Sequence, residues 1–219
     1  TFGRLAMFVG LAVLPLVTGE TTLSGMLAHP PAASGLVTSA VMLVLVGAIS
    51  KSALVPFHFW LPGAMAAPTP VSAYLHAAAM VKAGVYLIAL LAPVFAAAPG
   101  WRPVLVGLGL STMILGGLRA LRQYDVKLLL AYGTVSQLGF LIAIVGLGTR
   151  SAAFAGLAML CAHALFKSAL FLIVGIIDRS AGTRDLRELS GLRKQRPTLF
   201  IATVAATASM AGPPPLFGF

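Results

Sequence analysis

The sequence predicts an all-α polytopic membrane protein, and its composition and apolar patterning carry that prediction. Of the 219 residues, 59% are hydrophobic and 9% are charged, and the mean hydropathy is +0.98. Soluble domains carry about 25% charged and about 45–50% apolar residues, so a soluble fold of this length could not hide so much apolar surface. The apolar runs are long, rich in Ala and Leu and without alternation, which favours helices over transmembrane strands.

About seven apolar segments are candidates for transmembrane helices, because a helix crosses the hydrocarbon with about 20 residues at about 1.5 Å each. The expected helices cover 2–17, 35–57, 71–92, 103–118, 126–147, 152–177 and 198–219. Residues 1–219 are expected to form one transmembrane domain, since the connections are short except for the polar stretch 178–197. The chain starts without Met and stops inside an apolar segment, so we expect an internal piece of a longer protein.

The basic residues divide unequally between the two sides of the membrane. Alternating spans place nine Lys and Arg residues on the side of the loop 178–197, and only Arg102 and Arg150 on the other side. The nine are Arg4, Arg119, Arg122, Arg179, Arg184, Arg187, Arg193, Lys194 and Arg196. Because positively charged loops stay in the cytoplasm, we expect a cytoplasmic basic loop at 178–197. These loops also account for the net charge of +10, and no recognition motif indicates nucleic-acid binding.

One apolar segment, "VGAISKSALVPFHFWLP", contains both a lysine and a proline. Pro56 has no N–H to bond the carbonyl of Ser52, and its ring crowds the same turn. We therefore expect the helix to open one residue after Lys51, with free carbonyls that a cation or water can bind. Such breaks are tolerated at membrane depth where they line a cavity, and paired breaks are typical of transporter ion pathways. A second break is expected in the last segment, at Gly212, Pro213 and Pro214.

Five ionisable side chains from three segments are expected close to the middle of the membrane. Lys51 and His76 fall about 8 Å to the cytoplasmic side of the midplane, Lys82 and His163 fall at the middle, and Lys167 is about 4 Å away. A charge near the bilayer centre costs at least about 2.5–3.5 kcal/mol, so several of them favour a functional role. Two structural alternatives remain: Lys51 could snorkel to the headgroups, and His76 could be a satisfied core histidine.

The spacing of these residues predicts their relations. His163 and Lys167 are four residues apart, on one helix face and within about 6 Å. Two basic groups so close in a low dielectric lower each other's proton affinity, so such a pair can exchange a proton near neutral pH. His76 and Lys82 are six residues apart, so we expect them about 9 Å apart along the helix axis and on different faces, as successive relay stations joined by water. No organic cofactor and no metal site are expected, and the single Cys161 has no cysteine partner.

Three blocks of sequence resemble a known family. "KSALVPFHFWLPGAMAAPTPVSAYLHAAAMVKAGVYLIA", "YDVKLLLAYGTVSQLGF" and "HALFKSALFLIVG" are similar to the signature of proton-conducting antiporter-like subunits. Respiratory complex I and Mrp-type monovalent cation/proton antiporters share that signature. The stretches "MVKAGVYLIA" and "GTRDLRELSGL" look most like the A-type subunits of the Mrp antiporters. The resemblance extends from about residue 35 to the end of the chain.

The resemblance implies an inverted-repeat fold with discontinuous helices, of which this chain would hold the middle part. It implies that Lys127, at the start of its helix, is a further relay or gating lysine; the alternative is an interfacial lysine beside Asp125. His163 and Lys167 would link to a second half-channel, whose broken helix begins near Gly212. The implied partners are lipid, other membrane subunits of a hetero-oligomeric complex, protons, and Na⁺ or another monovalent cation.

The expected function is therefore that of a secondary transporter rather than an enzyme. The chain would be part of a multisubunit Na⁺/H⁺ antiporter of the bacterial cytoplasmic (inner) membrane, with protons passing along the Lys and His residues. Two alternatives stay open. One is a proton-pumping subunit of respiratory NADH–quinone oxidoreductase (complex I), and the other is a non-conducting scaffold whose charges only pack against sister subunits.

Overall fold

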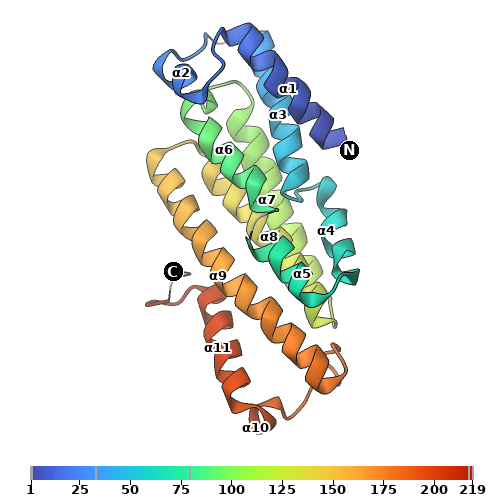
Figure 1. Ribbon diagram of the computed structural model, residues 1–219. Coiled ribbons are helices and arrows are strands. Elements are labelled where there is room, and N and C mark those ends of the chain that lie inside the picture. The colour runs from blue at the N-terminus through green and yellow to red at the C-terminus, as the bar shows by residue number, and fades with distance from the viewer. Residues whose placement is uncertain (1, 33, 79, 217, 219) are drawn as a thin grey trace.

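The computed structural model describes residues 2–32, 34–78, 80–216 and 218, and these residues form a helical membrane protein. The described part contains helices and one isolated backbone bridge, Asp125 to Asp185, but no strand. The helices run roughly along one long axis, with α1 and α3 at one end of the molecule and α10 and α11 at the other (Figure 1). This confirms the predicted all-helical membrane class.

Three helices are long and apolar enough to cross a membrane: α7 (Trp101–Ala120), α8 (Val126–Gly146) and α9 (Arg150–Ala181). They match the expected segments 103–118, 126–147 and 152–177, although α9 extends further into the polar loop than predicted. Shorter helices occupy the other apolar segments. They are α1 (Phe2–Thr18), α3 (Gly35–Lys51), α6 (Lys82–Phe95) and α11 (Pro197–Ala211). Two small helices, α2 (Leu23–Ala28) and α10 (Leu192–Gln195), lie in connections.

The expected helix over 35–57 is shorter than predicted. It ends as α3 at Lys51, and the chain then runs without regular helix to Pro56. Short helical pieces follow where the sequence indicated a plain connection. They are η1 (Phe57–Phe59), α4 (Trp60–Gly63) and η2 (Ala64–Ala66). In Figure 1, α4 lies further along the bundle axis than α3, so the chain continues in the same direction after the opening.

The prediction of one helix over 71–92 is wrong. The chain forms α5 (Thr69–Ala73), then a π-helical turn η3 (Tyr74–Ala78), and a new helix α6 from Lys82. A π turn accommodates an extra residue and frequently occurs at functional sites. The spacing that we expected between His76 and Lys82 assumed an unbroken helix and therefore does not apply.

Close helix packing holds the bundle together. At Gly109 of α7 an added Cβ would lie 2.7 Å from the carbonyl oxygen of Gly139 in α8. The backbones of these two helices therefore touch, which only residues without a side chain allow. One apolar core joins α3, α6, α7 and α8, and a second one joins α8 and α9 with residues from α5 and α11.

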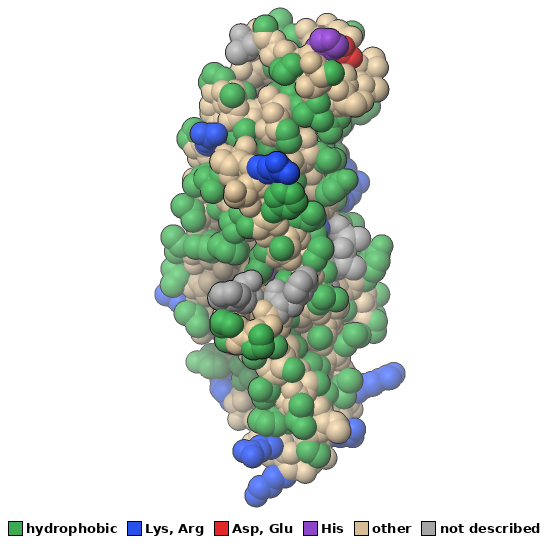
Figure 2. Space-filling view, turned by 90° about the vertical axis from the view of Figure 1, so that its left-hand side faces the viewer, with side chains coloured by type: hydrophobic (Ala, Val, Ile, Leu, Met, Phe, Trp, Pro, Cys, Tyr) green, Lys and Arg blue, Asp and Glu red, His purple; other side chains and the backbone are tan. Residues whose placement is uncertain are grey.

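The outer surface is largely apolar. Figure 2 shows hydrophobic side chains over most of one face and several Lys and Arg side chains at its lower end. Large apolar side chains stay exposed on the helices; Leu16 of α1, for example, is 84% exposed. Exposed apolar surface of this extent is what contact with lipid requires.

Candidate functional site: a buried group of lysines and histidines

Five of the six basic residues predicted for the site are buried in the bundle. The exposed fractions are 0% for His76, His163 and Lys167, 2% for Lys127 and 5% for Lys82, while Lys51 is half-buried. Lysines are almost never fully buried unless they have a partner. Three of them inside a 219-residue chain therefore mark this interior as unusual.

Residues His163 and Lys167 of α9 form the centre of the group. The Lys167 ammonium donates a hydrogen bond to the carbonyl oxygen of Leu130 in α8, 3.3 Å away. Gly133, one turn further along α8, leaves space for it, because an added Cβ would lie 3.1 Å from Nζ. His76 of the π turn lies against α9, since its ring centroid is 5.0 Å from that of Phe171 in that helix. The structure thus brings together residues from α8, α9 and the π turn.

The two buried imidazoles have ring nitrogens without a hydrogen-bond partner among the described residues. His76 lies on the π turn, with its ring centroid 5.0 Å from that of Phe171, and His163 makes an edge-to-face contact with Phe166 at 5.4 Å. Buried polar groups are otherwise almost always paired, with protein or with water. An imidazole with both nitrogens free can accept a proton on one and donate from the other.

Lys51 is the last residue of α3, beside the opening of the chain. The hydroxyl of the next residue, Ser52, donates to the carbonyl oxygen of Val81 at 2.8 Å, directly before Lys82. An added Cβ at Gly84 would overlap the carbonyl oxygen of Ala48 and the Ser52 hydroxyl. The end of α3 is thus held against the start of α6, which places Lys51 and Lys82 on adjoining helix ends.

Contacts from side chains hold the open stretch between α3 and η1. The backbone N–H of Val55 donates to the Thr112 hydroxyl of α7 at 3.0 Å, and the indole N–H of Trp60 donates to the Ser50 carbonyl at 3.2 Å. Ala53 has a positive φ of 53°, a conformation that residues other than glycine rarely adopt. Sequence reasoning missed Ser52, Thr112 and Gly133, because their partners are distant in the chain.

The predicted break residues lie at helix ends. Pro56 stands at the start of η1. Gly212 ends α11 with a φ of 80°, and its N–H donates to the Ala208 carbonyl at 3.0 Å. A glycine in this left-handed conformation is a common helix terminus. Pro213 and Pro214 follow outside the helix.

Lys127 belongs to a different set of contacts. Its ammonium donates to the carbonyl oxygens of Met65 at 2.9 Å and Ala67 at 2.5 Å. Asp125 caps α8 by accepting from the N–H groups of Lys127 and Leu128 at 2.7 and 3.2 Å. The Lys127 side chain is therefore buried in the protein at the start of α8, beside Asp125.

The polar loop after α9 folds back onto the turn between α7 and α8. Val126 donates its N–H to the Arg184 carbonyl at 3.0 Å, and Leu186 donates to the Tyr124 carbonyl at 2.9 Å. Arg187 binds Asp185 with two nitrogens, and these hydrogen bonds lower the pKa of that carboxyl to about 2. The end of α9 is therefore tied to the start of α8.

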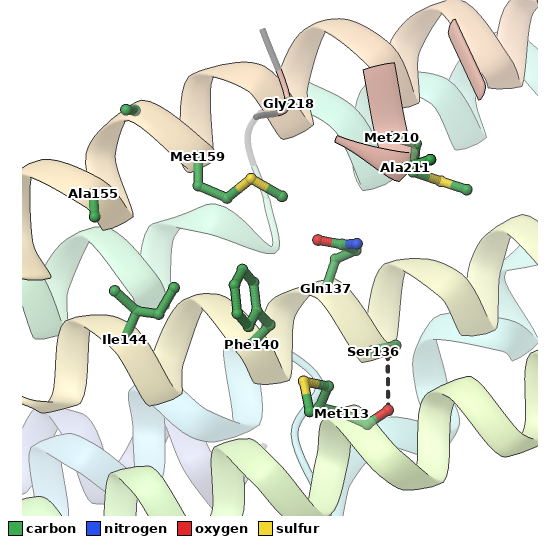
Figure 3. Close-up of a pocket in the computed structure, with 11 residues that line it drawn as sticks. Met113, Ser136, Gln137, Phe140, Ile144, Ala155, Met159, Met210, Ala211 and Gly218 are labelled. Atoms are coloured by element: carbon green, nitrogen blue, oxygen red, sulfur yellow. Dashed lines mark hydrogen bonds between the residues drawn. The ribbon is translucent and has the colours of Figure 1, made fainter. Parts of the chain in front are cut away.

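A separate cavity of about 510 Å³ lies between α7, α8, α9 and the end of α11 (Figure 3). Its walls are mostly apolar, with Phe140 and Met159 on facing sides and the Gln137 amide pointing into the space. The Ser136 hydroxyl donates a hydrogen bond to the Met113 carbonyl at 2.8 Å. None of the predicted basic site residues lines this cavity. Within the described residues, no cluster of His, Cys, Asp or Glu could hold a metal ion.

The fold and the site define a helical membrane protein with basic side chains buried at helix interruptions. The family model described as NADH:quinone oxidoreductase/Mrp antiporter, TM, matches residues 1–219. The chain belongs to this family, as the sequence blocks indicated.

Relatives of this chain are named as antiporter subunits. It is 46% identical over 234 residues to the A-type subunit of a Na(+)/H(+) antiporter of Alkalihalophilus pseudofirmus, covering 100% of this chain and 29% of that protein. It is 48% identical over 219 residues to a Rhizobium meliloti protein named "Probable K(+)/H(+) antiporter" and designated A/B, covering 99% of this chain and 22% of that protein. The chain thus spans less than a third of the length of these relatives.

The fold is similar to that of a solved antiporter complex. A chain of the Mrp complex from Dietzia sp. DQ12-45-1b matches with a TM-score of 0.94 and 45% sequence identity, over 99% of this chain and 24% of that chain. Sequence and fold agree that this chain resembles one part of a larger antiporter protein.

Proposed function

We propose that this chain is the central part of the A-type subunit of a multisubunit monovalent cation/proton antiporter, and that its buried lysines and histidines carry protons. The observation that carries the proposal is the burial of His163, Lys167, His76 and Lys82 in one bundle interior, with the His76 ring lying against Phe171 of the helix that holds His163 and Lys167. A charge near the bilayer centre is costly, so this concentration is explained by transport better than by packing. The proposal implies no bond-making chemistry, so the protein is a transporter and not an enzyme.

The proposed path begins at Lys51, where α3 opens. Protons pass through water to Lys82 on the adjoining end of α6 and to His76 on the π turn, and from there to His163 and Lys167 on α9. When one of these groups gains or loses a proton, the electrostatic balance of the next one changes. Gly212 and Pro213 then open α11, as Pro56 opens α3, and the path leaves toward a second half of the transporter.

The proposed setting follows from the charges and the relatives. About seven membrane segments would form part of an inverted-repeat fold. The basic loop 178–197 would face the cytoplasm of a bacterium, since positively charged loops stay on that side. Other proteins of the complex surround the chain. Na⁺ is the proposed cation, because the relative from Alkalihalophilus pseudofirmus is named as a Na(+)/H(+) antiporter subunit. The relative from Rhizobium meliloti is named as a probable K(+)/H(+) antiporter subunit.

Everted membrane vesicles test the proposal. The full-length protein is expressed with its partner subunits in a host without its own Na⁺/H⁺ antiporters, and the collapse of a proton gradient is followed on addition of Na⁺. We expect Lys51→Ala to abolish the Na⁺-dependent collapse while the protein stays inserted, and the exposed control Lys194→Ala to retain it. A Lys51→Ala variant with unchanged antiport would refute the role of this lysine.

A second candidate is a proton-pumping subunit of an NADH–quinone oxidoreductase, since the family includes both kinds of protein. The same vesicles separate the two, because this candidate requires proton pumping driven by NADH oxidation and no response to Na⁺. If several of the buried lysines are neutralised without effect on either activity, the chain is a scaffold instead.

A further inference from the structure

The position of Lys127 is unfavourable for an ordinary charged residue. It is the second residue of α8, where the helix dipole disfavours a cation, and its side chain is only 2% exposed. A lysine in such a place needs strong compensating contacts. Asp125, which caps the same helix end, supplies part of the compensation through its negative charge.

The remaining compensation comes from the end of another helical piece. The carbonyl oxygens that accept from the Lys127 ammonium belong to Met65, inside η2, and to Ala67, which caps it. The last carbonyls of a helix have no partner within the helix and carry its negative dipole end. Pro68 and Pro70, which follow directly, have no N–H to offer them. The Ser72 hydroxyl reaches the Ala67 carbonyl only at 3.5 Å.

We infer that Lys127 is a positioning residue, whose ammonium anchors the Met65–Ala67 turn to the start of α8. The turn joins the half-span after the opening at Ser52–Pro56 to α5, and α5 leads directly into the π turn that holds His76. Anchoring the turn therefore sets where His76 lies relative to Lys167. This consequence rests on the proposed proton path, whereas the anchor itself does not.

The anchor continues into the polar loop. The Arg184 guanidinium lies 3.6 Å from Asp125 Oδ2, and the Arg184 carbonyl accepts from the N–H of Val126. Thr69, next to the anchored turn, packs against α9 at Gly175, where an added Cβ would lie 3.1 Å from Thr69 Cγ2. The turn is therefore held from α8 on one side and from α9 on the other, and Lys127 supplies the hydrogen-bond donors.

The test uses a buried reporter in the full-length protein with its partner subunits. Met65 is 6% exposed, so Met65→Cys, in a background where Cys161 and any other cysteines are serine, should react slowly with N-ethylmaleimide. We expect Lys127→Met, which keeps an apolar stem but loses the donors, to raise the labelling rate about tenfold, since hydrogen bonds to charged groups contribute about 1.5–3 kcal/mol. The matched control Lys82→Met removes another buried lysine away from this turn and should leave the labelling rate unchanged.

Rescue by arginine separates positioning from proton relay. Lys127→Arg keeps the donors but cannot release its proton, so we expect slow labelling and retained antiport. An unchanged labelling rate in Lys127→Met overturns the anchor, and slow labelling with lost antiport in Lys127→Arg overturns positioning in favour of a relay.

If Lys127→Met fails to insert, Lys127→Gln takes its place, with the same expected rise in labelling. Labelling requires no transport, so an absence of antiport in the parent protein would refute the proposed function and leave this result standing.

Discussion

Two regions of similar apolar composition take opposite forms. Residues 101–146 form two uninterrupted helices, α7 and α8, whose backbones touch at Gly109 and Gly139. Residues 35–95 form α3, an opening, three short helical pieces, α5, a π turn and α6. The uninterrupted pair satisfies its own backbone polar groups, whereas the interrupted region must find partners for them, since lipid offers none.

Side chains supply those partners, and several come from the uninterrupted pair. Thr112 of α7 accepts from the N–H of Val55, and Lys127 of α8 donates to the carbonyls of Met65 and Ala67. The interrupted region also supplies its own, as Ser52 bonds to Val81. The comparison teaches that α7 and α8 act as a rigid support, which holds the interrupted region in the shape that buries His76 and Lys82.

The largest expected effect comes from separating α3 and α6. Gly84→Ala would push a Cβ into the Ala48 carbonyl and the Ser52 hydroxyl, and backbone cannot move aside as a flexible side chain can. We expect a destabilisation of about 3 kcal/mol, measured as a lower melting temperature of the purified complex in detergent. Gly107→Ala is the control, because a Cβ there meets nothing within 4 Å and should stabilise α7 by about 0.5–1 kcal/mol. Equal melting temperatures for the two variants would contradict the close contact.

A smaller effect is expected from removing one support of the opening. Thr112→Val keeps the shape of the side chain but leaves the N–H of Val55 without its acceptor, which should cost about 1–3 kcal/mol. Ser111→Ala is a close control, since the hydroxyls of Ser111 and Thr112 both donate to the Leu108 carbonyl, at 3.1 and 2.6 Å. Only Thr112 also holds the opening. A melting temperature of Thr112→Val as high as that of Ser111→Ala would show that the opening does not depend on α7.

The contrast between the two regions also marks how far sequence predicts the fold. The bounds of α7 and α8 follow from apolar length, because hydropathy alone decides where an uninterrupted span begins and ends. The opening after Lys51 has a local signal in Pro56. The π turn at Tyr74–Ala78 has none: residues 71–92 contain no proline, and their first glycine is Gly84. That interruption depends on packing against other helices, which no local pattern reports.

The candidate site divides in the same way. Charged residues within apolar runs are visible in the sequence, and four of them, His76, Lys82, His163 and Lys167, are buried in the bundle. Their neighbours were not predictable, because the contacts join residues far apart in the chain. Lys127, for example, donates a hydrogen bond to a carbonyl 60 residues away in the sequence. Its neighbour Asp125 gave no indication of that partner.

The substitution with the smallest expected effect on stability tests the proposed proton path most directly. Gly133 belongs to the supporting helix α8, yet an added Cβ would lie 3.1 Å from the ammonium of Lys167. Gly133→Ala should therefore displace that ammonium by a few tenths of an ångström and slow antiport measurably. The helix propensity gained, about 0.5–1 kcal/mol, should keep the melting temperature near that of the parent. Gly117→Ala is the control, because its Cβ meets only the Ser136 hydroxyl at an ordinary 3.7 Å, and it should transport normally. Full antiport in Gly133→Ala would mean that the exact position of the Lys167 ammonium does not limit transport, and α8 would then support the fold without tuning the path.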